Sequence, residues 1–431
     1  MTASALALIL FLTAVVAARK CNPWCSLGLV ETIPQNLTYK SGSPTYPSTY
    51  DAWLRLLDSA QESVSIASFY WTLRDNDSDP TDQEGMNIFN KLVETGKRGV
   101  KIQVVQNVPS HDYPDTDTVD LAAMGVAEVL SLNVSELFPG GGILHTKLWV
   151  VDGRHFYMGS ANMDWRSLTQ VKEMGVLGMD CECLAGDAYG LFQVYWYLAK
   201  TCHVPLHWNG TFSAEYNMKY PAEVLINGTD ATAFWASAPP EFCTEDRTSD
   251  IDALEKIIYS ATKFIYIAVM DYFPALIYTP NSSYWSRIDT AIRTMAYNGV
   301  HVRLMGSCWN NTSPDMDKFL SSLSTISGTN KGKALLETRF FVVPQLHDRS
   351  IPFARVNHNK YMVTDNAAYI GTSNWSGDYF VTTGGVSLSI NQTLTSSNLT
   401  VQVQLQEVFE RDWFSQYTTE HCTPPVDNGV H

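Results

Sequence analysis

The chain has 431 residues, which is too many for one typical hydrophobic core and fits two domains of roughly 200 residues each. With 45% hydrophobic and 17% charged residues, the composition is that of a globular protein. The formal net charge of −15 argues against a protein that coats nucleic acid with a generic basic surface, although a locally positive cleft is compatible with it. At about pH 5 the ten histidines would be largely protonated and bring the net charge to roughly −5.

The chain begins with an apolar run over Ala3–Ala18. Val16 and Ala18 are small residues at the positions that a signal peptidase reads, just before Arg19, so we expect residues 1–18 to be a cleaved signal peptide. The alternative is a signal anchor, but the run is shorter than the roughly 20 residues of a membrane span and has no basic flank before it. No later segment is apolar enough to span a membrane, and we expect a soluble mature protein without a stable transmembrane span.

Cysteines and glycosylation sequons indicate an oxidising compartment of the secretory pathway, so the protein should be luminal or secreted. The even number of cysteines favours disulfides, and a zinc site is the less favoured alternative for the first four because no nearby histidine completes it. The expected pairs join Cys21 and Cys25 to Cys181 and Cys183, Cys308 to Cys422 and, more weakly, Cys202 to Cys243. Asn-x-Ser/Thr sequons include Asn36, Asn76, Asn133, Asn209, Asn227, Asn281, Asn391 and Asn398.

Helix and strand patterns alternate along the first half and recur in the second. Between the first predicted strand and the next helix lie Asp75, Asp77, Asp79 and Asp82, whose spacing lacks the glycine and terminal glutamate of a calcium loop, so we expect a solvated loop. The first half is predicted to contain a helix over Tyr50–Ala60, a strand over Val64–Trp71, a helix over Glu84–Thr95 and a strand over Val100–Val105. The second half is predicted to contain a helix over Ile251–Ala261, a strand over Phe264–Val269, a helix over Tyr284–Tyr297 and a strand over Val300–Met305.

These landmarks indicate an internal duplication whose period is a whole domain. Gly99 corresponds to Gly299 at a distance of about 200 residues in the sequence. The alternation predicts two α/β lobes, each with a mixed or parallel sheet flanked by helices and with the active site at the lobe interface. We expect a first lobe over 19–218 and a second over 219–431, with the boundary near Tyr216–Glu223.

One motif occurs twice, as HTKLWVVDGRHFYMGSAN at 145–162 and HNKYMVTDNAAYIGTSN at 358–374. Histidine and lysine two positions apart share one face of a strand, while the aspartate seven positions after each histidine faces the other way, so we interpret Asp152 and Asp365 as structural. The glycine, hydroxyl residue and asparagine that follow predict a tight turn back to the histidine. The site expected from this pattern consists of His145, Lys147, Asn162, His358, Lys360 and Asn374.

Two imidazoles, two ammonium groups and two amides are suited to a phosphodiester. One histidine would attack phosphorus and form a phosphohistidine, the other would protonate the leaving oxygen, and the lysines and asparagines would stabilise the non-bridging oxygens. With two lysines to offset charge, no metal or other cofactor is expected. A lone histidine or lysine in an apolar strand is usually incidental, but recurrence of six matched positions makes coincidence a poor explanation.

These motifs resemble the HKD motifs of the phospholipase D superfamily. The segments ASFYWTL, SANMDWRSLTQVKE, VNHNKYMVT and YIGTSNWSG further resemble its luminal branch, phospholipase D types 3 and 4, over most of the mature chain. The resemblance implies a lysosomal five-prime exonuclease that acts on single-stranded DNA and RNA, often as a homodimer. Branch members carry a cytoplasmic tail and an anchor, and since almost nothing precedes the apolar run here, we expect direct secretion or delivery to the lysosome.

By the same resemblance, Glu173 occupies the position of a carboxylate that orients a motif histidine; the alternative is a solvated helix residue. The matching place in the second copy falls at Gly385-Val386, where no carboxylate is present. We therefore expect unequal roles, with Glu173 supporting the first copy, His145 as the nucleophile and His358 as the acid.

Aromatic residues follow equivalent strands in the two copies, at Phe69-Tyr70-Trp71 and Tyr272-Phe273. Tyr70 and Trp71 are candidates for stacking against bases, and core packing is an equally good explanation. The spacing itself does not separate a nuclease from a phospholipase D that hydrolyses lipid or transfers a phosphatidyl group, nor does it exclude a glycoprotein that only binds anions. The family resemblance favours the nuclease.

Overall fold

The computed structural model describes residues 22–74, 79–111, 114–138, 140–208, 210–279, 281–392 and 400–424. The expected signal peptide, Cys21, Asp75 and Asp77 lie outside these residues, as do the sequons at Asn76, Asn209 and Asn398. Within the described ranges, no helix has both the length and the apolar character needed to cross a membrane.

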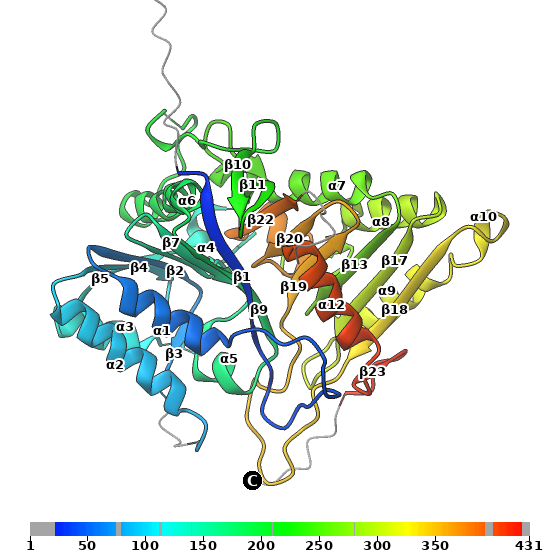
Figure 1. Ribbon diagram of the computed structural model, residues 1–431, viewed down its shortest axis with the longest axis horizontal. Helices are drawn as coiled ribbons and strands as arrows, with labels where there is room; N and C mark the ends of the chain where they lie inside the picture. The colour runs from blue at the N-terminus through cyan, green and yellow to red at the C-terminus, as the bar shows by residue number, and fades with distance from the viewer. Residues whose placement is uncertain are drawn as a thin grey trace, which may run out of the picture.

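The first half of the chain contains a series of paired strands (Figure 1). Their spatial order is β5-β4-β2-β6-β7-β9-β1, in which the first three are mutually parallel and the others run antiparallel to their neighbours. These strands are β1 (Trp24–Thr32), β2 (Ser63–Ser68), β4 (Lys101–Asn107), β5 (Ala127–Leu132), β6 (Leu148–Val151), β7 (His155–Gly159) and β9 (Glu173–Met179).

The second half repeats this scheme on the other side of the molecule. Its order is β18-β17-β13-β19-β20-β22-β11, again with three parallel strands followed by antiparallel ones. The strands are β11 (Thr229–Ala238), β13 (Phe264–Val269), β17 (His301–Ser307), β18 (Leu335–Phe341), β19 (Lys360–Thr364), β20 (Ala368–Gly371) and β22 (Gly385–Gln392). The repeated order confirms the predicted duplication.

The two series are joined through the centre of the molecule. Strand β1 pairs in parallel with β10 (Ala222–Ile226), which pairs antiparallel with β11. The lobe boundary predicted near Tyr216–Glu223 overlaps the start of β10, and it stays a prediction. Short strands complete the pairing: β3 (Trp71–Thr72), β8 (Met163–Asp164), β12 (Thr248–Ser249), β14 (Tyr272–Phe273), β15 (Ala275–Leu276), β16 (Ser283–Tyr284), β21 (Trp375–Ser376) and β23 (Thr418–Thr419).

Helices cover both sheets, and the predicted elements are present within a few residues of their expected bounds. The longer helices are α1 (Thr49–Ser59), α2 (Gln83–Lys97), α3 (Thr116–Ala123), α6 (Glu182–Thr201), α7 (Asp250–Ser260), α8 (Arg287–Tyr297), α9 (Pro314–Ser324) and α12 (Val401–Trp413). Shorter ones are α4 (Val134–Leu137), α5 (Trp165–Thr169), α10 (Thr329–Gly332), α11 (Asp378–Val381) and the 3-10 turns η1 (Gly210–Phe212) and η2 (Pro240–Phe242). Helix α8 begins later than predicted because Ser283 and Tyr284 form β16 instead.

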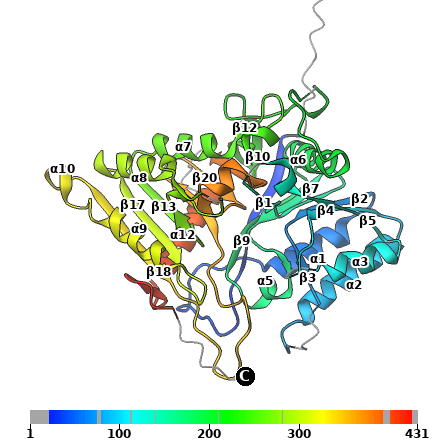
Figure 2. The ribbon, with the colours of Figure 1, turned by 180° about the vertical axis from the view of Figure 1, so that it is seen from behind.

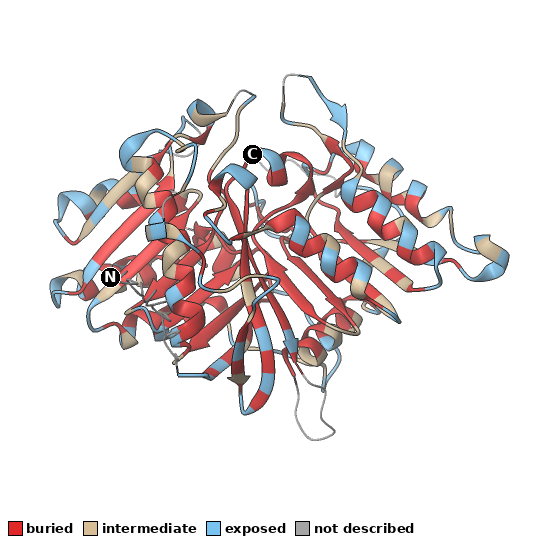
Figure 3. Ribbon diagram, turned by 90° about the horizontal axis from the view of Figure 1, so that it is seen from above, coloured by how far each residue is buried: buried red, intermediate tan, exposed pale blue. Residues whose placement is uncertain are grey.

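Each sheet is buried on both faces, which gives the molecule five layers (Figures 1 and 3). In the first half, residues from α1 and α2 pack on one face, while α6 packs on the other. In the second half α7, α8 and α9 cover the outer face, and α12 lies on the inner one. The central cluster contains side chains of α6, α12 and both sheets, so the halves share one core.

The disulfide predictions are partly confirmed. Cys25 pairs with Cys181, and Cys308 pairs with Cys422. The weaker prediction, a bond between Cys202 and Cys243, is wrong because both thiols are free. Cys202 is exposed at the end of α6, whereas the Sγ of Cys243 lies 3.3 Å from the backbone oxygen of Ser237. The confirmed bonds fit a secreted or luminal protein.

Candidate active site

A cavity of about 180 Å³ lies where the two halves meet. Both motif histidines line it, together with both motif asparagines and Glu173. The cavity therefore brings together residues that are separated by some 200 positions in the sequence. Figure 2 shows the two halves of the chain that supply them side by side. The motif lysines are buried, at 2% and 1% exposure.

The histidine segments are held by backbone pairing across the two halves. His145 donates its N–H to Gly384 O at 2.8 Å, and His358 donates its N–H to Lys172 O at 2.8 Å. Gly384 and Lys172 occupy matching places in the two copies. Lys172 directly precedes Glu173, and Gly384 directly precedes Gly385, which stands where the second copy lacks a carboxylate. The strands β6 and β19 begin only at Leu148 and Lys360, so the prediction that histidine and lysine lie on one regular strand is wrong. Neither half can build its histidine geometry alone.

His145 is oriented by a backbone carbonyl. Its Nδ1 lies 2.9 Å from Thr372 O, and the carbonyl can only accept, so Nδ1 carries the proton. In the neutral ring, Nε2 then keeps its lone pair. Burial, followed by the charge of Lys147, holds the pKa of His145 well below its usual value. This shift favours the neutral form of the ring, in which Nε2 carries a lone pair.

His358 is oriented by Glu173, and this corrects the prediction that Glu173 supports the first copy. The His358 Nδ1 lies 2.9 and 3.1 Å from the two Glu173 carboxylate oxygens. Burial raises the pKa of Glu173 to about 7, and burial followed by Lys360 lowers the pKa of His358. The two groups form a hydrogen-bonded dyad, so their titrations are coupled.

Each histidine is oriented by a group from the other copy, and the hydroxyl residues in the second part of each motif explain this arrangement. The Ser160 hydroxyl of the first copy donates to Glu173 at 2.5 Å, and the Thr372 carbonyl of the second copy accepts from His145. Thr372 and Val386 exchange the same hydroxyl bonds as Ser160 and Met174, which places Gly385 in register with Glu173. A Cβ at Gly385 would lie 2.4 Å from the Ser373 hydroxyl oxygen, so a side chain at this position would have to displace that hydroxyl.

The motif lysines donate hydrogen bonds to the histidine backbone, and burial together with their charges lowers the pKa values of both histidines. Lys147 Nζ donates to His145 O at 2.7 Å, and Lys360 Nζ donates to His358 O at 2.8 Å. Burial lowers the pKa of Lys360 to about 7, and burial together with Lys360 holds the pKa of Lys147 well below its usual value. A bound phosphodiester anion would oppose both shifts, because it stabilises the ammonium forms.

The motif asparagines lie in the cavity with unused acceptor capacity. Asn162 Nδ2 donates to Tyr70 OH at 3.4 Å, and Asn374 Nδ2 donates to Tyr379 OH at 3.2 Å. Both amide oxygens are buried and form no hydrogen bond with the described residues. Asn374 is 4% exposed, so its Asn-Trp-Ser sequon is closed to glycosylation.

The motif aspartates are structural, as predicted. Asp152 accepts from the backbone N–H groups of Gln61, Glu62 and Ser63 at 2.7–2.9 Å. Asp365 accepts in the same way from the N–H groups that precede β13. Each carboxylate thus fixes the start of the first central strand in its own sheet, away from the cavity.

Two cavity residues were not identified from the sequence. Asp271 is half-buried, accepts from Asn374 Nδ2 at 3.0 Å and has its pKa raised to about 6 by desolvation. Tyr379 packs against His145 at a ring distance of 5.1 Å. Asp271 occupies the place that Tyr70 takes in the first copy, before equivalent short strands, and this register was the signal that could have found it.

The predicted aromatic substrate residues lie in different environments. Tyr70 lines the cavity, and its hydroxyl donates to Asp164 at 2.8 Å. Trp71 is 1% exposed and donates from Nε1 to Ser68 Oγ at 2.7 Å. It belongs to the core and offers no ring face to a substrate. The acidic loop is also less solvated than predicted, since Asp79 forms an ion pair with Arg349 at 2.7 Å.

A buried chain of charges lies behind the His358–Glu173 dyad. Lys172 forms an ion pair with Asp412 at 2.8 Å, with both side chains at 0% exposure. Arg411 bonds Asp412 at 3.0 Å and Glu31 at 2.8 Å. Because Lys172 O also holds the His358 N–H, these pairs connect α12 and β1 to the backbone of the dyad.

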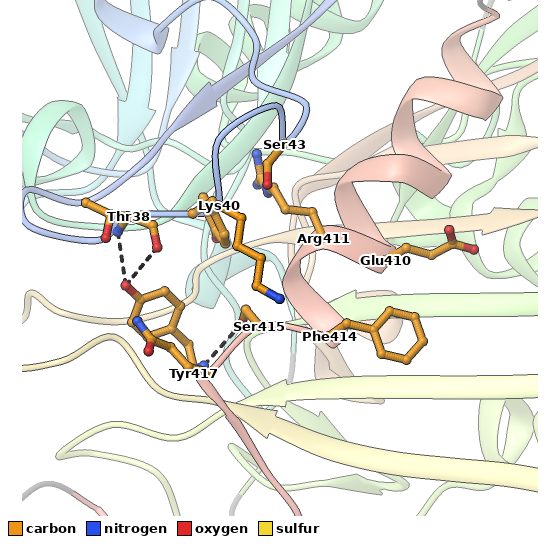
Figure 4. Close-up of a pocket in the computed structure, with 10 residues that line it drawn as sticks. Thr38, Lys40, Ser43, Glu410, Arg411, Phe414, Ser415 and Tyr417 are labelled. Carbon is orange, nitrogen blue, oxygen red and sulfur yellow. Dashed lines mark hydrogen bonds between the residues drawn. The ribbon is translucent and has the colours of Figure 1, made fainter.

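The far end of this chain reaches a separate surface pocket of about 660 Å³ (Figure 4). There the Arg411 guanidinium lies 4.2 Å from the Tyr39 ring centre, and the Tyr417 hydroxyl bonds the backbone of Thr38. The guanidinium is only 2% exposed and is occupied by carboxylates. The pocket is the largest by volume among those described, but it lacks the paired histidines of the smaller cavity.

Comparison with known proteins identifies the family. The family model described as PLD3/4, PLD-like domain matches residues 41–346. The 5'-3' exonuclease PLD3 of Xenopus tropicalis is 44% identical over 406 residues, which cover 93% of this chain and 81% of that protein. The 5'-3' exonuclease PLD4 of Mus musculus is 44% identical over 411 residues, covering 94% and 81%. The 5'-3' exonuclease PLD3 of Homo sapiens is 44% identical over 404 residues, covering 92% and 81%.

Solved structures share the architecture at low sequence identity. A phosphatidylserine synthase of Haemophilus influenzae Rd KW20 aligns with a TM-score of 0.56 and 13% identity, covering 86% of this chain and 85% of that one. A polyphosphate kinase of Porphyromonas gingivalis aligns with a TM-score of 0.50 and 11% identity, covering 89% and 50%. These likenesses concern the fold alone. The family match and the 44% identical relatives show that the chain belongs to the PLD3/4 family of the phospholipase D superfamily.

Proposed function

We propose that the protein is a metal-independent phosphodiesterase that removes nucleotides from the five-prime end of single-stranded DNA or RNA. The observation that carries this proposal is the pair of differently oriented histidines in one cavity, with His145 on a backbone carbonyl and His358 on a carboxylate. The first keeps a lone pair for attack, and the second has a partner that stabilises its protonated form.

In the proposed reaction His145 Nε2 attacks the phosphorus atom of the scissile phosphodiester. The N–P bond forms as the P–O bond to the leaving nucleotide breaks, and the leaving oxygen takes the proton of His358. Water then attacks the phosphohistidine, the same dyad accepts the proton of that water, and the N–P bond breaks. Lys147, Lys360 and the two asparagines stabilise the charge on the non-bridging oxygens.

The names of the relatives support nucleic acid as the substrate, since those proteins are named 5'-3' exonucleases. The disulfides support a secretory route, and the pKa shifts of His145 and Glu173 suit an acidic lumen. We place the protein in the lysosome or outside the cell and propose that it forms a homodimer, which light scattering of the purified protein would test.

The test compares substrates at about pH 5 in EDTA. Single-stranded DNA labelled at either end should be shortened from the five-prime end, and a phosphatidyl substrate should be turned over far more slowly. His145→Ala and His358→Ala serve as inactive controls. Turnover of the lipid alone would replace the nuclease by a lipid-transforming enzyme, and full activity in both variants would refute the two-histidine mechanism.

A further inference from the structure

A second cavity of about 300 Å³ opens beside His145. It is continuous with the catalytic cavity, because Phe69, His145, Tyr278 and Tyr379 line both. Both halves of the chain contribute to its wall. The residues that line only this second cavity are Gly140, Gly142, Ile143, Asp378, Thr382 and Thr383.

Aromatic rings form the junction between the two cavities. The His145 ring lies 5.3 Å from Phe69 and 5.1 Å from Tyr379, measured between ring centres. Tyr379 in turn lies 6.2 Å from Tyr278, whose side chain is 63% exposed. A flat ring system that enters this space meets aromatic and aliphatic surface while its attached phosphate remains within reach of His145.

Two polar side chains of the wall, Asp378 and Thr382, are already hydrogen-bonded within the protein. Asp378 accepts from the backbone N–H groups of Ile277 at 2.7 Å and Tyr278 at 3.1 Å, so this carboxylate positions the Tyr278 segment. The Thr382 hydroxyl donates to Asp378 O at 3.3 Å. Recognition in this cavity therefore depends on stacking and apolar contact, which do not distinguish one base from another.

The first-half side of the wall depends on glycine. Gly142 has φ +139°, and a Cβ at this position would collide with the Thr382 carbonyl oxygen. The glycine segment can therefore lie directly against the second half and close the cavity. Gly384 N–H donates to Ile143 O at 2.8 Å, which fixes Ile143 beside the His145 backbone.

We propose that this second cavity binds the nucleobase of the nucleotide that is being removed. The inference rests on the proposed nuclease function and adds the part of the substrate that is recognised. A base paired in a duplex cannot enter the cavity, because its partner strand would have to enter as well. A preference for single strands then follows from the shape of the site.

The test uses two oligonucleotides that differ only in the terminal residue, which carries either a base or a tetrahydrofuran in its place. The native protein should cleave the abasic end about tenfold or more slowly in kcat/KM, as expected for the loss of one stacked base. Tyr278→Ala and Ile143→Trp should lower kcat/KM on the normal end and have little effect on the abasic end. Tyr278→Phe keeps the ring and should retain discrimination.

Phe414→Ala is the matched control, because this aromatic residue is 62% exposed and lines the distant pocket. This variant should leave kcat/KM unchanged on both oligonucleotides, and thermal unfolding midpoints should show that all variants are folded. Equal native rates on both ends, or equal losses on both ends in the Tyr278→Ala variant, would overturn the base subsite. Absence of cleavage of either oligonucleotide by the native protein would instead refute the proposed nuclease function.

Discussion

The two half-sites contain the same residue types but orient their histidines differently. His145 is held by a neutral carbonyl, whereas His358 is held by a carboxylate from the opposite copy. A carboxylate stabilises an imidazolium much more than a carbonyl does, because the bond is charge-assisted. The difference teaches that two copies of one motif can hold their histidines in unequal environments, because the first copy has Glu173 where the second has Gly385.

The largest effects on activity are expected for the two histidine variants, and substrates with different leaving groups should distinguish them. His145→Ala should abolish both turnover and formation of a phosphorylated protein, because the nucleophile is missing. His358→Ala should lose about 10²–10⁴-fold on DNA. On a p-nitrophenyl phosphodiester, whose leaving group needs no proton, it should still release a burst of p-nitrophenol, because only the later hydrolysis of the phosphohistidine then lacks its base. Rapid-quench trapping of labelled protein measures the intermediate. Labelling of the His145→Ala variant would reverse the assigned roles.

Glu173→Gln tests the carboxylate directly. The native kcat/KM should be high in acid and fall above about pH 7 as the dyad loses its proton. Without the carboxylate, burial and the charges of Lys360 and Lys147 still lower the pKa of His358, so the falling limb should move to lower pH. We expect activity near the optimum to drop by about 10²-fold or more.

The matched control for this variant is Glu337→Gln, which alters a histidine–glutamate pair outside the active site. Glu337 lies 2.6 Å from His301 on the surface of the second sheet. The pH profile of kcat/KM for the Glu337→Gln variant should equal that of the native protein. A profile of the Glu173→Gln variant that is reduced in height but unshifted would argue against the coupled titration.

Lys172→Met tests the buried charges behind the acid side. It leaves Asp412 buried without its closest cation, and stability should fall by about 3–5 kcal/mol. Adding Asp412→Leu should recover most of that loss. Denaturant unfolding measures the free energy, with Arg247→Met as control because Arg247 and Asp187 form a similarly buried pair elsewhere. Lys172→Met should also lower kcat in the remaining folded protein, and Arg247→Met should not.

The Gly385→Glu variant tests whether a carboxylate can be introduced at the place in the second copy that matches Glu173. The new side chain meets the Ser373 hydroxyl in a packed region, so we expect a loss of about 1–3 kcal/mol in stability and reduced activity. Thermal unfolding and kcat measure the two effects. A stable and fully active variant would mean that the missing carboxylate is an accident of sequence with no steric cause.

The smallest effect is expected at the structural aspartates. Asp152→Asn and Asp365→Asn keep an acceptor but weaken charge-assisted bonds to backbone N–H groups, which should cost about 1 kcal/mol each. The pH profile of activity should be unchanged in both. A shifted profile in either variant would place that aspartate in the chemistry after all.

Local sequence was sufficient for much of this molecule. The periodicities predicted the alternating helices and strands, and the displacement of landmarks predicted the duplication. Odd spacing from the histidine predicted a structural role for Asp152 and Asp365. Their bonds to backbone N–H groups agree with that role, although the histidines precede the strands on which the argument relied. Two of the expected disulfides followed from cysteine spacing, whereas Cys202 and Cys243 did not pair because cysteine number alone does not fix distance.

Tertiary structure decided how the residues are paired. The sequence placed Glu173 in the first copy but could not reveal that its carboxylate crosses to His358, because that contact depends on how the halves pack. It could not place Trp71 in the core and Tyr70 in the cavity, although they are neighbours. Nor could it identify the cavity beside His145, since that cavity arises only where the two halves meet. Spacing therefore determined the chemistry of each half-site, and packing between the halves determined which group serves which histidine.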